Sequence, residues 1–328
     1  MGSPHPRGWW PGLRPRLGVA LGGGAARGLA HLGVLQVLEE NGLAPAAVAG
    51  TSIGALFGSL WMVEGSARSA ADRVAAFVAS DDYRRTRVEF LKPAPDEGGW
   101  ADSLGEAVRR GIVLSWTYFK ESFVSEDDFR HNAEALLPDC RIEDLPLPFC
   151  AVATDLCSGA SVFFRRGSLR EAVLASGAVP ALMPPRRIGG RLLVDGVVSE
   201  KVPTRALQAM GVDVVVGVDV SADEEDLPAP QDLDSGAEIL ARAKRITEAH
   251  LRASRLALCD LVIRPKVGSF HWLDFSGAMP AVEEGRRAME EALPILRRIL
   301  ARRRWCPPRH DARRLESRGL FGRPAEEV

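Results

Sequence analysis

Several features that define common protein classes are scarce or missing in this sequence. The five cysteines are odd in number and irregularly spaced, and no C-x-x-C pair occurs. This argues against a zinc site or a disulfide framework and suits a reducing compartment. No apolar run approaches the length that spans a membrane. The formal net charge is only −1, so no global field draws the chain to nucleic acid.

The first residues also lack the apolar segment of a secretory signal, which favours the cytoplasm. We expect residues 1–15, rich in Pro, Gly and Arg, to form a disordered leader, and residues 306–328 to form a flexible basic tail. Residues 286–328 hold twelve Arg against six Asp and Glu, which is typical of a solvated helix face followed by a tail. The same excess of positive charge leaves open a peripheral contact with anionic lipid at the inner membrane face.

What the sequence does have is 328 residues with 46% hydrophobic content, enough for one sizeable core. Strand and helix patterns alternate near its start, with a strand at 17–21, a helix at 28–41, a buried strand at 46–49 and a helix at 53–63. This alternation predicts an α/β fold with a mostly parallel central sheet.

The rest of the chain continues this pattern after an interruption. We expect a helical insertion over about residues 66–145. Sheet character then returns, and the first two segments after the insertion form an antiparallel pair across a Ser-Gly turn. The predicted later strands are 148–154, 161–164, 191–196, 213–220 and 260–265, and a final amphipathic helix covers about 280–304.

The stretch LGGGAARGLAHLGVL, residues 21–35, puts bare backbone between a strand and a helix. The spacing of the glycines argues against a nucleotide-phosphate site, because it matches neither the Walker pattern nor the dinucleotide-binding pattern. A developing oxyanion needs backbone N–H groups that already point at it. Arg27 and Gly28 would then shape the loop and open the helix, with Arg27 in a structural role. The amides that we expect to serve as donors are Gly23, Gly24 and Ala25.

The segment GTSIG, residues 50–54, matches the G-x-S-x-G pattern of a nucleophile elbow. A strand precedes it and a helix follows, which is the context that the motif requires. Gly50 and Gly54 let the turn tighten and keep side chains away from the hydroxyl of Ser52. The alternative is an ordinary tight turn with a serine cap.

A serine nucleophile needs a proton acceptor, and the best candidate is Asp195. It ends a strand in LLVDGVV and is followed by Gly196, and the carboxyl ends of parallel strands share one rim. Partial burial would raise its pKa toward that of a useful base. The alternative is a plain Asp-Gly turn. Asp155 and Asp219 also follow strands and are weaker candidates, and we interpret Asp155 as a turn former.

A histidine base is the second hypothesis for activating the serine. None of the six histidines sits in a sharp turn directly after a strand. His271 is the best remaining candidate for a Ser–Asp–His order, and His250 and His310 are the further histidines to test. His31 lies in the first turns of the helix after the glycine loop, where packing is the commoner role.

Four segments in order resemble the patatin-like phospholipases, particularly the bacterial members. They are LGGGAARGLAHLGVL, GTSIGAL, VATDLCSGASVFFRRGSLREAVLASGAVPALMPP and LLVDGVVSEKVP. The resemblance covers about residues 16–300, and we expect the domain to occupy 16–305. It implies a three-layer α/β/α fold, a Ser52–Asp195 dyad without catalytic histidine, metal or cofactor, and an oxyanion hole in the glycine loop. The implied reaction is hydrolysis of acyl esters of phospholipids or lysophospholipids.

The sequence departs from the family pattern at three positions. Ala25 and Val197 stand where glycine or a smaller residue is usual, and Lys201 replaces a common Asn. Besides a serine lipid acyl hydrolase, two hypotheses therefore stay open. One is a Ser–Asp–His esterase, thioesterase or peptidase. The other is a patatin-like scaffold that binds lipid or a protein without turnover. Apolar stretches near 111–124 and 269–275 would line an acyl channel or touch a membrane.

Overall fold

The structure is a computed structural model that describes residues 14–85, 122–221, 235–305 and 326–327. The expected leader lies almost wholly outside these ranges, as do the apolar stretch at 111–121 and most of the expected tail. Within the described residues, nine strands form one sheet. They are β1 (Leu17–Leu21), β2 (Ala47–Thr51), β3 (Phe149–Asp155), β4 (Ser161–Phe164), β5 (Arg186–Ile188), β6 (Arg191–Asp195), β7 (Val214–Val218), β8 (Leu261–Ile263) and β9 (Glu326–Glu327).

Helices follow most of the strands. The α-helices are α1 (Ala30–Glu40), α2 (Ile53–Glu64), α3 (Ala67–Val78), α4 (Asp81–Arg85), α6 (Glu126–Leu136), α7 (Leu169–Ser176), α8 (Thr204–Ala209), α9 (Gly236–Leu256) and α10 (Ala281–Arg303). Short 3-10 turns are η1 (Ala25–Leu29), η3 (Ile142–Asp144) and η4 (Gly196–Val198). The described part of the segment at 66–145 is largely helical, as expected.

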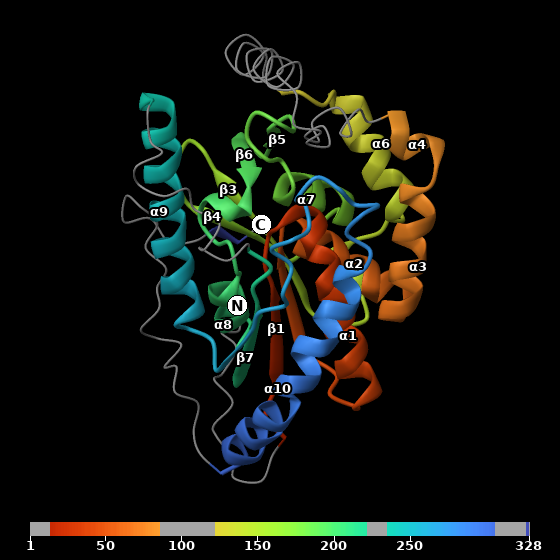
Figure 1. Ribbon diagram of the computed structural model, residues 1–328, viewed down its shortest axis with the longest axis vertical. Helices are drawn as coiled ribbons and strands as arrows, with labels where there is room; N and C mark the ends of the chain where they lie inside the picture. Colours follow the sequence, from red (N-terminus) through yellow and green to blue (C-terminus); the bar gives the residue numbers. More distant parts are fainter. Residues whose placement is uncertain (1–13, 86–121, 222–234, 306–325, 328) are drawn as a thin grey trace, which may run out of the picture.

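Helices cover both faces of the sheet, so the expected three-layer α/β/α arrangement is confirmed. The α1, α2, α3 and α10 helices lie on one side, and α8 and α9 lie on the other (Figure 1). The strand order is β5-β6-β3-β2-β1-β7-β8, with β4 and β9 branching from β3. The neighbours from β3 to β8 along this order run parallel, which matches the prediction of a mostly parallel sheet.

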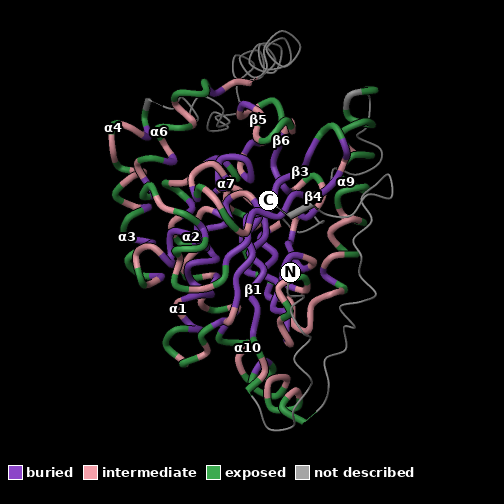
Figure 2. The backbone as a smooth tube through the Cα atoms, turned by 180° about the vertical axis from the view of Figure 1, so that it is seen from behind, coloured by how far each residue is buried: buried purple, intermediate pink, exposed green. Residues whose placement is uncertain are grey.

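Side chains that alternate along the central strands fill the two layers between sheet and helices. In β1, Val19 and Leu21 pack with the core on the α1 side, whereas Ala20 packs with the smaller core on the α8 side. In β2, Val48 takes the first side, and Ala47 and Ala49 take the second. All of these strand residues are buried, as the central strands of Figure 2 show.

One edge of β3 is shared by two strands, and this arrangement positions the site. Ala151–Thr154 of β3 pair with β4 along one edge. Along the opposite edge, β2 pairs with the first part of β3 and β6 pairs with the last part. Because β2 runs parallel to β3 and β6 runs antiparallel, the carboxyl ends of β2 and β6 point at each other. Ser52, which follows β2, and Asp195, which ends β6, therefore lie end to end.

Asp195 does lie beside Ser52, but not at the place in the sheet that we expected. We expected both to share the rim where parallel strands end, but β6 is antiparallel to β3. A short hairpin produces this direction: β5 pairs with β6 across Gly189 and Gly190, which have φ of 58° and 78°. Two adjacent residues with positive φ form the tight turn of a two-residue β-hairpin.

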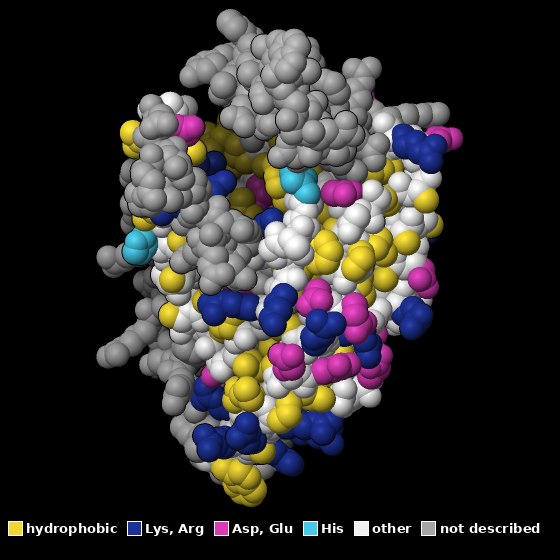
Figure 3. Space-filling model, viewed as in Figure 1, with side chains coloured by type: hydrophobic (Ala, Val, Ile, Leu, Met, Phe, Trp, Pro, Cys, Tyr) yellow, Lys and Arg dark blue, Asp and Glu magenta, His cyan; other side chains and the backbone are white. Residues whose placement is uncertain are grey.

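One edge of the sheet carries a strand that the sequence patterns did not predict. The β9 strand, Glu326–Glu327, runs parallel to β4, so this part of the expected flexible tail is paired with the sheet. The α9 helix stands at the side of the molecule, and the face in Figure 3 is hollowed next to it. No helix of the described residues is long and apolar enough to cross a membrane.

The α1 and α10 helices cross with their backbones in close contact. A Cβ on Gly33 of α1 would lie 1.9 Å from the carbonyl oxygen of Val282, and a Cβ on Gly285 of α10 would lie 1.9 Å from that of Ala30. Each glycine thus lets the other helix approach backbone to backbone. This contact holds α10 against α1 on one side of the sheet.

We therefore expect Gly33→Ala to lower the free energy of unfolding by about 1–3 kcal/mol through overpacking. Helix propensity alone would favour alanine by about 1 kcal/mol, so the sign of the change tests the contact. Chemical denaturation measures it. Gly236→Ala at the start of α9 is the control, because a Cβ there meets nothing within 4 Å. Equal stability of the two variants would contradict this account.

Candidate active site

Ser52 stands at the turn between β2 and α2 in a backbone conformation that few side chains adopt. Its φ is 56° and its ψ is −124°, which places it in the strained positive-φ region. The Ser52 N–H donates to Ser176 Oγ at 2.8 Å, and Ser176 Oγ donates to the Val152 carbonyl at 2.6 Å. These two hydrogen bonds hold the strained turn from β3 and from the end of α7.

The glycines of the GTSIG segment leave room for this turn. A Cβ on Gly54 would lie 2.2 Å from the carbonyl oxygen of Leu21, and one on Gly50 would lie 2.4 Å from the Ala55 nitrogen. The start of α2 thus packs directly against the end of β1, beside the glycine loop. A side chain at either position would push the serine out of place.

The hydroxyl of Ser52 is hydrogen-bonded to the carboxylate of Asp195. Ser52 Oγ lies 2.5 Å from Asp195 Oδ2, and the Val197 N–H donates to the other carboxylate oxygen at 2.8 Å. The Asp195 side chain is completely buried. Gly196 is part of the η4 turn that presents the Val197 amide, and a Cβ on Gly196 would lie 2.2 Å from the Val152 carbonyl oxygen. Sequence reasoning proposed this pair, and the fold brings the two side chains together.

Burial controls the ionisation of this carboxyl group. It raises the pKa of Asp195 from 3.8 to about 7, because the charged form loses its hydration. The hydrogen bonds from Ser52 and Val197 and the charge of Lys201 act in the opposite direction. A carboxylate whose pKa lies near neutrality can both take up and release a proton at the pH of the cell.

The glycine loop contributes fewer available donors than the sequence suggested. The Gly23 N–H donates to the Lys201 carbonyl at 2.9 Å, so this amide is already used and does not support our assignment of Gly23 as an oxyanion donor. The hydrogen bonds of the described residues leave the amides of Gly24 and Ala25 without an acceptor. Ala25 has a φ of 49°, a conformation that glycine adopts more easily. The loop can thus offer two amides.

Arg27 and His31 fix the glycine loop through hydrogen bonds to backbone carbonyl groups. Arg27 Nε donates to the Phe270 carbonyl at 2.8 Å and Nη2 to the Gly268 carbonyl at 3.1 Å. His31 Nε2 donates to the Gly22 carbonyl at 2.7 Å, and burial lowers the pKa of His31 to about 4, so the ring is neutral. Both contacts are structural. Gly28 lies in η1 and packs against Ile53 at the start of α2.

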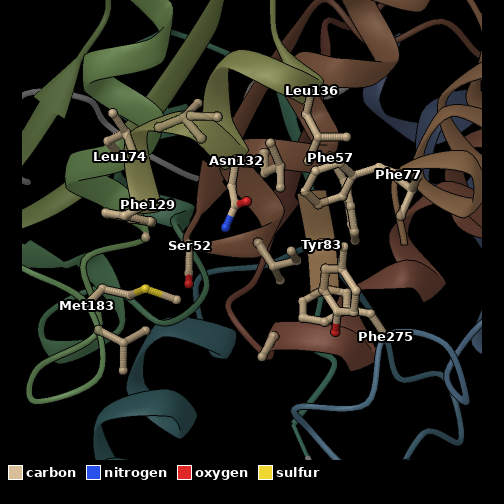
Figure 4. Close-up of a pocket in the computed structure, with 18 of the residues that line it drawn as sticks. Ser52, Phe57, Phe77, Tyr83, Phe129, Asn132, Leu136, Leu174, Met183 and Phe275 are labelled. Atoms are coloured by element: carbon tan, nitrogen blue, oxygen red, sulfur yellow. The ribbon is translucent and has the colours of Figure 1, made fainter. Parts of the chain in front are cut away.

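An apolar cavity of about 180 Å³ opens beside Ser52. Figure 4 shows the Ser52 side chain at this cavity and aromatic and aliphatic side chains around it. Among the residues of the 269–275 stretch, Trp272, Leu273 and Phe275 line it. Further lining residues come from the helices: Leu56, Phe57, Phe77, Phe129, Leu136 and Leu174. Walls of this kind bind a hydrocarbon chain by excluding water.

The other candidate bases lie elsewhere or are engaged differently. None of the histidines in the described ranges is hydrogen-bonded to Ser52 or Asp195; His271 Nδ1 accepts from the Leu273 amide instead. His310 lies outside the described residues. Asp155 accepts from Ser158 and from the Cys157 amide, as a turn former does, whereas Asp219 faces two arginines. The described part of the chain also has no group of three or more potential metal ligands.

Ser176 is the supporting residue that sequence reasoning missed. Its hydroxyl accepts from the nucleophile's own amide and donates to β3, and it is fully buried. No local pattern marks it, because it simply ends an amphipathic helix. Only the docking of α7 against β3 reveals its role.

Comparison with known proteins shows the family to which this chain belongs. A family model for patatin-like phospholipases matches residues 19–207, and the chain therefore belongs to the patatin-like phospholipase family. This family acts on lipid substrates. An uncharacterised NTE family protein of Mycobacterium tuberculosis is 33% identical over 239 residues, which cover 72% of this chain and 57% of that protein.

Two further likenesses extend the comparison. Patatin-like phospholipase domain-containing protein 7 of Mus musculus is 30% identical over 285 residues, covering 79% of this chain and 19% of that protein. The crystal structure of VipD from Legionella pneumophila is similar at a TM-score of 0.43 and 17% identity, covering 86% of this chain and 67% of that one. The chain thus spans little more than half the length of the mycobacterial relative and a fifth of the mouse protein.

The raised pKa of Asp195 predicts an unusual pH dependence of stability. The folded state holds the Asp195 proton up to about pH 7, whereas the unfolded chain releases it near 3.8. The contribution of this group to stability is therefore fully present below pH 4 and is lost as pH rises toward 7. We expect Asp195→Asn to match wild type below pH 4 and to exceed it by roughly 2–4 kcal/mol at pH 8. Denaturation curves across this range measure the difference, and a difference that is constant with pH would contradict it.

Proposed function

We propose that this chain is a serine lipid acyl hydrolase that cleaves carboxylic ester bonds of phospholipids or lysophospholipids through a Ser52–Asp195 dyad. The observation that carries the proposal is the hydrogen bond between Ser52 Oγ and the buried carboxylate of Asp195, at the mouth of an apolar cavity. A nucleophile, a base and an acyl-sized apolar surface then stand in one place.

In the first step, Ser52 Oγ attacks the ester carbonyl carbon while its proton passes to Asp195 Oδ2. The carbonyl oxygen becomes an oxyanion, and the amides of Gly24 and Ala25 donate to it. Losing one such donor typically costs about 100- to 1000-fold in rate. The pKa of Asp195 near 7 makes it a far better base than an exposed carboxylate would be.

In the second step, the bond from the carbonyl carbon to the alcohol oxygen breaks, and the proton on Asp195 goes to the leaving alcohol. The acyl group stays on Ser52 as an ester. A water molecule then gives a proton to Asp195 and attacks the carbonyl carbon of this ester. The tetrahedral intermediate collapses as the bond from that carbon to Ser52 Oγ breaks and Asp195 returns the proton to Ser52 Oγ, which releases the fatty acid. The acyl chain lies along the apolar cavity throughout, because this apolar surface keeps the hydrocarbon out of water after it leaves the lipid.

A binding role without turnover is the second candidate. The observation that favours it is Ala25, whose methyl group stands at a φ of 49° in the loop that would stabilise the oxyanion. A fluorophosphonate probe distinguishes the two, because it reacts only with an activated serine. A folded protein that resists labelling at Ser52 would favour the scaffold.

We expect Ser52→Ala and Asp195→Asn each to lower the release of fatty acid from a short-chain ester by at least about 1000-fold. His271→Ala, and separately His250→Ala and His310→Ala, are the controls and should retain the wild-type rate.

For wild type, kcat/KM should rise with pH up to about 7, because Asp195 must be ionised to accept the proton. A lipid panel with wild type and Ser52→Ala then identifies the substrate. Full activity in either dyad variant, or loss of activity in a histidine variant, would reject the dyad.

A further inference from the structure

The α6 helix presents one polar side chain to the apolar cavity beside Ser52. Four residues of α6 line this cavity at helical spacing: Phe129, Asn132, Ala133 and Leu136. A helix stripe that faces the interior is normally apolar throughout. Asn132 interrupts this one with a side-chain amide. Figure 4 shows that amide pointing into the cavity, between Ser52 on one side and aromatic side chains on the other.

The Asn132 amide has no hydrogen-bond partner among the described residues. Its Oδ1 atom is buried and unpaired, and its Nδ2 atom donates to none of these residues. A buried polar atom without a partner destabilises a fold, and asparagine is also a poorer helix former than leucine. A position that breaks two local rules, with no compensating contact inside the protein, is expected to serve a ligand.

The cavity wall around Asn132 narrows the class of ligand. None of the described residues that line the cavity is Lys, Arg, His, Asp or Glu, so a charged group would be buried without a counter-ion. A side-chain amide offers one acceptor oxygen and one donor NH₂ group. A ketone only accepts and would leave Oδ1 unpaired. A neutral hydroxyl group both donates and accepts, and on a hydrocarbon chain it also suits the apolar walls.

We propose that Asn132 is a specificity-determining residue that binds a hydroxyl group on the acyl chain of the substrate. This inference rests on the proposed function, which places the acyl chain in the cavity, and it narrows the substrates to esters of hydroxylated fatty acids. While the acyl carbonyl carbon lies at Ser52, a hydroxyl group at the matching carbon of the chain forms hydrogen bonds with the amide. Because the amide projects from the α6 wall only, it reaches one configuration of a secondary hydroxyl group.

A series of esters with one leaving group tests this preference. The full-length protein is given p-nitrophenyl octanoate and its 2-hydroxy, 3-hydroxy and 8-hydroxy derivatives, with the chiral esters as single enantiomers. We expect at least about tenfold higher kcat/KM for one hydroxylated ester than for the plain ester, because the plain chain leaves the amide unpaired. If that ester is chiral, its mirror image should react more slowly. A plain ester that reacts as fast as every hydroxylated ester would overturn the inference.

Asn132→Leu assigns the preference to the amide and cancels differences in the intrinsic reactivity of the esters. Leucine has a similar volume and no polar atom, so the plain ester should become the faster substrate. Gln208→Leu is the matched control, because Gln208 also has a buried, unpaired amide but lies on α8, across the sheet from the cavity. It should keep the wild-type ratio. A ratio that Asn132→Leu leaves unchanged, or that both variants change equally, would overturn the inference.

Thermal stability separates a ligand-binding role from a merely structural one. If Asn132 served only the fold, its replacement would lower the melting temperature. A polar side chain that is unpaired until a ligand binds destabilises the free protein, so Asn132→Leu should raise the melting temperature of the ligand-free enzyme. A lower melting temperature in the variant would contradict the proposal.

The alcohol part of the substrate is a second source of a hydroxyl group. A lysophosphatidylcholine with a plain acyl chain and its analogue without the glycerol hydroxyl group distinguish this source. We expect wild type to hydrolyse both at similar rates, within about threefold, because the apolar cavity suits the acyl chain and not the glycerol. A tenfold or larger preference for the lysophospholipid, lost in Asn132→Leu, would overturn the assignment to the acyl chain.

Binding without turnover keeps this inference separate from the proposed function. By calorimetry, Ser52→Ala should bind the methyl ester of the preferred hydroxyoctanoic acid at least about tenfold more tightly than methyl octanoate. Adding Asn132→Leu should remove this difference. The same binding preference in a chain whose wild type hydrolyses no ester would support the role of Asn132 and reject the proposed function. Equal binding of the two methyl esters would overturn the role of Asn132, whatever the rate of hydrolysis.

Discussion

The head-on meeting of β2 and β6 along one edge of β3 is the constraint on which the site depends. It sets the residue after β2 and the last residue of β6 against each other, so that Ser52 Oγ reaches Asp195 Oδ2 at 2.5 Å. The same arrangement encloses the carboxyl group completely, and enclosure raises its pKa to about 7. Position and basicity of the proposed base therefore have one structural cause.

The strain at the nucleophile is held by its neighbours. The positive φ of Ser52 needs support, and the Ser176 hydroxyl supplies it by bridging the Ser52 amide to β3. On the other side, the Gly23 amide donates to the Lys201 carbonyl, so the glycine loop is bonded to the segment after Asp195. A backbone hydrogen bond thus connects the loop of the proposed oxyanion donors to the segment that follows the proposed base.

Local patterns in the sequence predicted seven of the nine strands that the structure describes, the elbow turn and the two candidate dyad residues, since apolar runs and turn glycines report directly on strand ends. The direction of β6 was not predicted, because it depends on a hairpin with the short, polar β5, whose only signal is Gly189-Gly190. The helix expected from Gly28 consists of the 3-10 turn η1 from Ala25 to Leu29, which continues directly into α1 from Ala30. Ser176 and the engagement of Gly23 are long-range contacts, which no local pattern carries.

The proposed chemistry depends on a buried Asp195 carboxyl group that titrates near neutrality. Infrared difference spectroscopy of wild type minus Asp195→Asn tests it most directly, because a protonated carboxyl group has its own C=O stretching band. The account predicts a band that is present at pH 5 and disappears with a midpoint of about 7. A midpoint near 4, the value of an exposed aspartate, would contradict it.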